Sequence, residues 1–154
     1  MSKLIINVSL PTNKKFFLDE LDSYMYQTVG HEAIALIAGA IALPIFRQRT
    51  NGKAICKDKL YIETDNDEVE DLIALLTKVK DEMHIEGVAV GAIASDYQRS
   101  RVEHVCRRLS LKSFAFLWQR NQEELLEEMI QAEMEIIIIK VASLGLNPDV
   151  HLGV

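Results

Sequence analysis

Short apolar runs, many of them rich in β-branched residues, alternate along the chain with longer stretches of helical periodicity. Runs of strand length occur at residues 4–10, 45–50, 87–93, 113–118 and 135–142. Stretches with apolar residues at turn spacing occur at residues 21–43, 67–84, 95–109 and 121–133. Strands that alternate with helices at this spacing predict an α/β fold with a mainly parallel sheet.

The helix predicted at residues 67–84 has the clearest pattern. Its first turn is acidic, which suits the helix dipole, and one face carries an apolar stripe of Val69, Leu72, Leu76 and Val79. Pro44 ends the helix predicted at residues 21–43. The strand after it is expected to enter a tight turn at Asn51-Gly52.

Composition indicates a soluble protein with one domain, residues 1–154. Apolar residues make up 49% and charged residues 26% of the 154 residues, enough for a sizeable core. The net charge is -6 and no long basic block occurs, which argues against a nucleic-acid partner. Cys56 and Cys106 are expected to be free thiols, and no run reaches transmembrane length. We therefore expect a cytoplasmic protein without a membrane partner.

The stretch GAIASDYQRSRVEHVCRRL, residues 91–109, places many polar side chains where a strand leads into a helix. Ligands of parallel sheets bind at the carboxyl ends of the strands. One interpretation is structural: Ser95 and Gln98 form a capping box, and Arg99 pairs with Glu103. The alternative is that the helix start binds an anion, with Arg99 or Arg101 reinforcing it.

Other constellations give weaker signals. His31-Glu32 lacks the second histidine of a zinc-protease motif, and His104 with Cys106 is interpreted as a surface histidine beside a core thiol. We therefore expect no metal site. Trp118 is either a core or rim aromatic or a ring that stacks on a base. Neither a Gly-x-Gly-x-x-Gly motif nor a Walker phosphate loop occurs.

Five long blocks in order resemble the diphthine–ammonia ligase family: residues 19–34, 67–72, 91–109, 117–130 and 138–153. The resemblance implies a Rossmann-like domain of the N-type ATP pyrophosphatases. It also implies ATP with Mg²⁺, ammonium as co-substrate, and translation elongation factor 2 as the partner. In that family ATP adenylates the diphthine carboxyl group, ammonia attacks it, and AMP and pyrophosphate leave.

The resemblance also implies site residues. The block at residues 95–103 is similar to the family's segment at the mouth of the nucleotide and substrate cleft, which gives Ser95, Asp96, Tyr97, Gln98, Arg101 and Glu103. A second group of candidates comes from the block that begins at residue 19 and from the tryptophan: Asp19, Glu20, Asp22, Ser23, Tyr24, Gln27 and Trp118.

Two features of the family are missing from the sequence: the first strand with its Ser-Gly-Gly-Lys-Asp-Ser phosphate loop, and the later Glu-Gly-Gly-Glu-Tyr-Glu-Thr motif. The run at residues 4–10 aligns with the family's second strand. Its central neighbour is then absent, so we expect two unpaired strand edges unless this run moves into the vacant position. One lost electrostatic donor costs about 2.7–4 kcal/mol in an analogous site, so loss of the loop predicts very slow turnover.

Two alternatives to ligase activity therefore stand. One is a catalytically inactive partner that binds elongation factor 2 or the full-length ligase. The other is a nucleotide-binding domain similar to the universal stress proteins, whose glycine-rich phosphate motif is also missing here.

Overall fold

The computed structural model describes residues 5–9, 23–26, 30, 33–141 and 144–153. The chain forms two compact units, Met1–Trp118 and Gln119–Val154, which we call unit 1 and unit 2. The expectation of one domain over residues 1–154 stays a prediction. None of the described helices is long and apolar enough to cross a membrane.

Unit 1 contains two pairs of parallel strands, as the alternating pattern predicted. β1 (Ile5–Ser9) pairs with β2 (Ile45–Arg49), and β3 (Gly87–Ala89) pairs with β4 (Lys112–Phe114). Within the described part of the chain the two pairs form separate sheets. Among the described residues β1 pairs with β2 and not with β3. The expectation of two unpaired strand edges stays a prediction.

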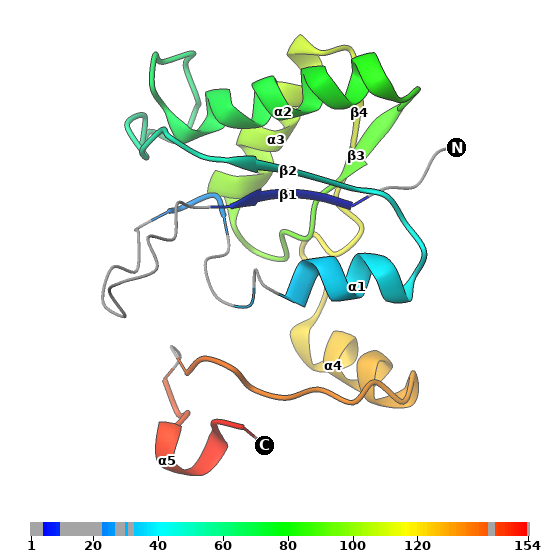
Figure 1. Cartoon of the computed structure of the whole chain (residues 1–154). Coiled ribbons are helices and arrows are strands. Elements are labelled where there is room, and N and C mark those ends of the chain that lie inside the picture. The colour runs from blue at the N-terminus through cyan, green and yellow to red at the C-terminus, as the bar shows by residue number, and fades with distance from the viewer. Residues whose placement is uncertain (1–4, 10–22, 27–29, 31–32, 142–143, 154) are drawn as a thin grey trace, which may run out of the picture. The chain divides into compact units, whose positions relative to one another are not determined.

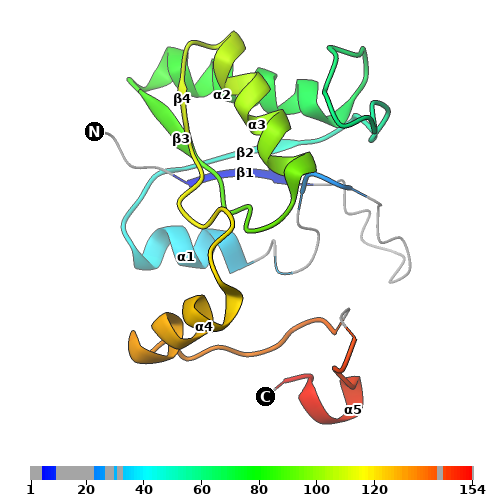
Figure 2. The ribbon, with the colours of Figure 1, turned by 180° about the vertical axis from the view of Figure 1, so that it is seen from behind.

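Three helices cover the strands of unit 1. α2 (Glu68–Glu82) and α3 (Asp96–Arg108) lie on one side of β1 and β2, and α1 (Ile34–Ala40) lies on the other side, as Figures 1 and 2 show from opposite directions. α2 packs on both β2 and α3. The long helices predicted at residues 67–84 and 95–109 are thus confirmed.

The helix predicted over residues 21–43 is much shorter than expected. Of its described residues only α1 is an α-helix, and residues 24–26 form a bend. The hydroxyl of Ser23 accepts hydrogen bonds from the amides of Met25 (3.1 Å) and Tyr26 (2.8 Å). A serine that binds nearby amides in this way competes with helix formation.

The core of unit 1 lies between α2 and α3. The predicted stripe on α2 is buried, with Leu76 and Val79 fully so. It meets the apolar face of α3, so burial of apolar area holds the two helices together. The core residues are Met25, Tyr61, Val69, Leu72, Leu75, Leu76, Val79, Ile85, Val102, Val105, Cys106 and Leu111.

Unit 2 contains α4 (Gln122–Gln131), as predicted, and the single turn α5 (Pro148–His151). The prediction of a strand at residues 135–142 is wrong for its described part, because residues 135–141 form no strand. A β-branched run becomes a strand only where a neighbouring strand satisfies its backbone. The run at residues 113–118 is likewise strand only to Phe114, after which Trp118 donates to the carbonyl of Ala115.

Candidate functional site

α3 begins at an edge of unit 1 where several connections meet. In Figures 1 and 2 its first turn lies beside the carboxyl end of β1, next to residues 23–26. β2 runs parallel to β1, so its carboxyl end and the connection that follows lie at the same edge. The predicted junction therefore does sit at the carboxyl ends of parallel strands, where ligands of such sheets bind.

Ser95 caps α3, but the predicted capping box is only half formed. The Ser95 hydroxyl accepts from the backbone amide of Gln98 at 3.3 Å. The Gln98 side chain does not return the contact. Its Nε2 instead donates to the carbonyl of Tyr24 at 3.2 Å. Gln98 therefore ties the start of α3 to residues 23–26, a segment more than 70 residues earlier in the chain.

Aromatic rings extend this contact. The rings of Tyr24 and Tyr97 lie 5.5 Å apart between centroids, and the ammonium group of Lys57 lies 5.0 Å from the centroid of Tyr24. The Tyr97 hydroxyl is buried and has no hydrogen-bond partner within the described residues. Burial raises the pKa of Tyr97, and the nearby charge of Arg101 opposes this rise. The Tyr97 hydroxyl is thus a buried, neutral donor without an acceptor among the described residues.

Among the candidates that the structure describes, Arg101 alone lies fully inside the protein, with 0% of its surface exposed. Its guanidinium lies 3.3 Å from the centre of the Tyr97 ring. Its nitrogens donate to the carbonyls of Cys56 (2.5 Å), Asp58 (3.0 Å) and Tyr97 (3.3 Å). A guanidinium held in this way fixes residues 56–58 against α3 and is not available as a surface ligand for an anion.

The exposed side of α3 carries the other charged candidates. Arg99 pairs with Glu103 at 2.9 Å, as predicted, and lies 3.6 Å from Asp96. The Arg99 guanidinium also stacks at 4.3 Å over the partly buried ring of Trp118. The Asp96 side chain is 69% exposed. Asp96 is therefore the most accessible charged candidate at the helix start, and Glu103 is committed to Arg99.

Carboxylates at the start of α2 hold the connections that face α3. Asp67 accepts from the amides of Ile55 (3.0 Å) and Cys56 (2.8 Å) and also caps α2 through Val69. Asp71 accepts from the Thr50 hydroxyl and from the amides of Asn51 and Gly52, both at 2.9 Å. Because these amides bind Asp71, no turn forms at Asn51-Gly52, contrary to the prediction.

The third acid, Glu68, reaches residues 23–26. Its carboxylate accepts from the hydroxyl of Ser23 at 2.7 Å and from the amide of Met25 at 3.2 Å. The Tyr26 hydroxyl donates to the Glu68 carbonyl at 2.7 Å. Of the second group of candidates, Ser23 and Tyr24 thus lie at the site, and Trp118 lies on Arg99. Asp19, Glu20, Asp22 and Gln27 lie outside the described residues.

Sequence reasoning missed Asp67, Glu68, Asp71 and Lys57 as parts of this site. It explained the acids by the helix dipole alone, and two of the three are buried. The sequence did carry a signal: several acids stand at the start of α2, although one acid is enough to cap a helix. Buried carboxylates need several donors, and here those donors come from three earlier segments of the chain.

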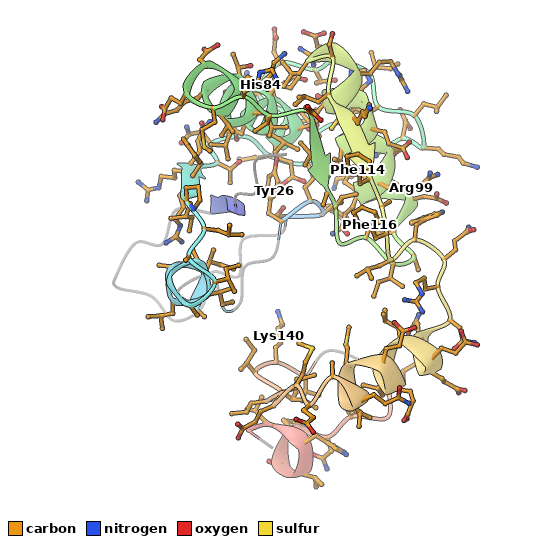
Figure 3. The ribbon with its side chains drawn as sticks, turned by 90° about the vertical axis from the view of Figure 1, so that its right-hand side faces the viewer. Tyr26, His84, Arg99, Phe114, Phe116 and Lys140 are labelled. Carbon is orange, nitrogen blue, oxygen red and sulfur yellow. The ribbon has the colours of Figure 1, made fainter. Side chains whose placement is uncertain are left out.

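The described histidines of unit 1 are His84 and His104. Figure 3 shows His84 at the far end of α2, away from Tyr26. His104 is half-buried against Tyr61, not on the surface as predicted, and burial lowers its pKa. Cys106 is a buried free thiol, as expected. No group of three His, Cys, Asp or Glu side chains in the described part of the chain is arranged to hold a metal ion.

Comparison with known proteins identifies the family. The family model of the diphthamide synthase N-terminal domain matches residues 14–113. Diphthine–ammonia ligases from Bos taurus (57% identity), Danio rerio (59%) and Schizosaccharomyces pombe (48%) match 93%, 88% and 84% of this chain. The matched part is 54%, 53% and 22% of those proteins. The chain therefore spans about half the length of the two vertebrate relatives and less than a quarter of the Schizosaccharomyces pombe protein. The α/β arrangement agrees with this match, and the chain belongs to the diphthamide synthase family.

Proposed function

We propose that this chain forms part of the nucleotide and substrate cleft of an ATP-dependent diphthine–ammonia ligase. The diphthine carboxylate attacks the α-phosphate of ATP and pyrophosphate leaves. Ammonia then attacks the acyl carbon, which yields diphthamide and releases AMP. The substrate is diphthine on translation elongation factor 2, which implies a cytoplasmic location. The names of the relatives and the high identity support this reaction.

One observation carries the location of the cleft. The start of α3 and residues 23–26 are joined by the Gln98–Tyr24 hydrogen bond at the carboxyl ends of the parallel strands. Ser95, Asp96 and Tyr97 stand at this junction. Ser95 accepts from the Gln98 amide, but the amides of Asp96 and Tyr97 have no acceptor within the helix, which favours an acceptor group of a ligand there.

The described residues fit the nucleoside of ATP better than its phosphates. The exposed Asp96 carboxylate repels a phosphate but accepts hydrogen bonds from ribose hydroxyls, and Tyr24, a residue that is 54% exposed, offers an aromatic ring for stacking. Arg101 is fully buried and its two terminal nitrogens donate to carbonyl groups, so its guanidinium makes no direct contact with a phosphate. The proposal therefore assigns Mg²⁺, the phosphates and ammonium to other parts of a complete ligase cleft.

The first test is calorimetric titration of the chain with Mg-ATP, AMP and adenosine. We expect all three to bind with similar affinity, because the contacts are made to the nucleoside. Asp96→Asn should weaken binding about tenfold, the typical loss for a hydrogen bond to a charged group. Glu82→Gln, an exposed change at the other end of α2, should leave affinity unchanged. Absence of binding by the folded chain contradicts the proposal.

A binding role without catalysis is the second candidate. It is favoured by the burial of Arg101, which leaves the start of α3 without a free guanidinium for a triphosphate. In this case the chain binds elongation factor 2 or the full-length ligase. Binding of diphthine-bearing elongation factor 2 without formation of AMP supports this function, whereas AMP and diphthamide formed in equal amounts support the ligase.

A further inference from the structure

Glu68 is a carboxylate placed where it is costly to keep. Only 1% of the residue is exposed, and no cationic group bonds to it among the described residues. Burial raises the pKa of Glu68, and the hydrogen bonds from Ser23 and Met25 only partly oppose the rise. A raised pKa means that the ionised carboxylate disfavours the folded state above that pKa. Stability alone therefore gives no reason for an acid at this position.

The carboxylate and the carbonyl of Glu68 both bind one short segment, residues 23–26. One carboxylate oxygen takes the Ser23 hydroxyl and the other takes the Met25 amide, while the Glu68 carbonyl takes the Tyr26 hydroxyl. The Ser23 oxygen has its own two acceptor positions filled by the amides of Met25 and Tyr26. The Ser23 hydroxyl therefore donates its hydrogen bond to the Glu68 carboxylate, and both carboxylate oxygens act as acceptors.

We propose that Glu68 is a positioning residue that holds residues 23–26 in the bent conformation required for the wall of the cleft. The wall consists of Tyr24 and the two α3 residues that contact it, Tyr97 through its ring and Gln98 through its side chain. Among the described residues no hydrogen bond joins the Glu68 side chain to Tyr97 or Gln98, and its carboxylate meets Tyr24 only at the backbone. Glu68 acts through Ser23 and Met25, the neighbours of Tyr24 in the chain.

Glutamine is the informative replacement because it keeps the shape of the side chain and removes one acceptor. The NH2 group of the glutamine can face either of the two partners. If it faces the Ser23 hydroxyl, it meets an oxygen whose acceptor positions are already filled. If it faces the backbone N–H of Met25, two donors oppose each other. One hydrogen bond to the segment is lost in each case. The buried charge is lost as well, so global stability should stay the same or rise while the segment loosens.

Hydrogen exchange of the whole chain tests the positioning without any ligand. In Glu68→Gln the Met25 and Tyr26 amides should exchange about tenfold faster, as expected for one lost hydrogen bond, with α3 amides unchanged. Ser23→Ala should have the same local effect, and the double variant should exchange no faster than the faster single one. Glu82→Gln is the matched control. Faster exchange throughout the chain, or no change at Met25 and Tyr26, overturns the proposal.

The consequence for the cleft rests on the proposed function and has its own measurement. Glu68→Gln should lower the affinity for Mg-ATP about tenfold without lowering the denaturation midpoint, a pattern that a purely structural role does not give. If Asp96→Asn weakens binding and Glu68→Gln does not, the positioning role is overturned and the proposed function stands. If the unchanged chain binds no nucleotide, the proposed function fails, and the positioning of a nucleotide wall fails with it.

Discussion

At the scale of single residues, burial decides what the charged groups near α3 are able to do. Arg101 and Asp96 are five positions apart in sequence and were both candidates for ligand contact. Arg101 is completely buried and donates to three carbonyl groups, whereas the Asp96 side chain is largely exposed. Substitution of Arg101 therefore reports on folding, and substitution of Asp96 reports on binding.

Arg101→Ala should reduce the free energy of unfolding by about 3 kcal/mol or more, because each unsatisfied buried polar group costs roughly 1–3 kcal/mol. The carbonyls of Cys56 and Asp58 lose the donor that Arg101 supplies, whereas the Tyr97 carbonyl keeps the Ser100 hydroxyl. Urea denaturation followed by circular dichroism measures the effect. Arg107→Ala, an exposed change on the same helix, should stay within about 0.5 kcal/mol. Equal losses in both variants would contradict the structural role of Arg101.

The two thiols should differ in reactivity because the thiolate is the reactive species. Burial raises the pKa of Cys106 to about 11, whereas the partly exposed Cys56 side chain is accessible to reagents. With iodoacetamide at pH 8, Cys56 should be alkylated first, and Cys106 should react only after unfolding or as the pH approaches its raised pKa. Peptide mass spectrometry over time follows both. Equal labelling in the native chain would show that Cys106 is not buried in solution.

At the scale of elements, the start of α2 organises the site. Asp67, Glu68 and Asp71 each bind a different stretch of the preceding chain. The stretches bound by Glu68 and Asp67 also contact α3, through Tyr24 and Cys56. Gly52 passes so close that an added Cβ would lie 2.6 Å from the Asp67 carbonyl carbon and the Glu68 nitrogen. The connection after β2 and the first turn of α2 are thus packed backbone against backbone.

Gly52→Ala should destabilise the protein by about 1–3 kcal/mol, because a methyl group pushed against backbone forces the connection to shift. The shift should also weaken the hydrogen bonds from Asn51 and Gly52 to Asp71. Gly39→Ala is the matched control, since no atom lies within 4 Å of an added Cβ there. It should be neutral or stabilise α1 by up to about 1 kcal/mol. Thermal melts of both variants make the comparison, and an unchanged melting temperature for Gly52→Ala would refute the close packing.

At the scale of the whole molecule, the described core cluster belongs to unit 1, and most of the large apolar side chains described in unit 2 are exposed, with Leu125 as a buried exception. Every residue of the core cluster lies between Met25 and Leu111. In unit 2 the exposed apolar residues include Ile136, Ile137 and Ile139, which are 52–60% exposed. An apolar β-branched run without a strand partner is a common site of self-association.

The chain should therefore self-associate as its concentration rises. Light scattering after gel filtration measures the mass at several concentrations. The double change Ile137→Glu and Ile139→Glu should shift the equilibrium to the monomer, because it places charges on the apolar run. Glu124→Gln, an exposed change on α4, serves as the control. Association that does not respond to the double change would place the contact elsewhere on the molecule.

The sequence by itself determined the features that depend on neighbours in the chain. Helical periodicity predicted α2, α3 and α4, and the cap at Ser95 follows from a serine that binds an amide three residues later. Alternation of strands and helices predicted the parallel pairing, and the ordered blocks indicated the family. Each of these inferences depends on local preferences or on a pattern that survives in the sequence.

Only the tertiary structure decided which groups meet over long distances. The same β-branched composition gives a strand at residues 5–9, which pair with β2, and none at residues 135–141, where the described chain offers no partner. Arg101 is buried and binds the carbonyls of Asp58 and Cys56, which lie 43 and 45 residues earlier in the chain. Glu68 reaches Ser23 across 45 residues. Spacing in sequence carries no information about such partners, because they become neighbours only when the chain has folded.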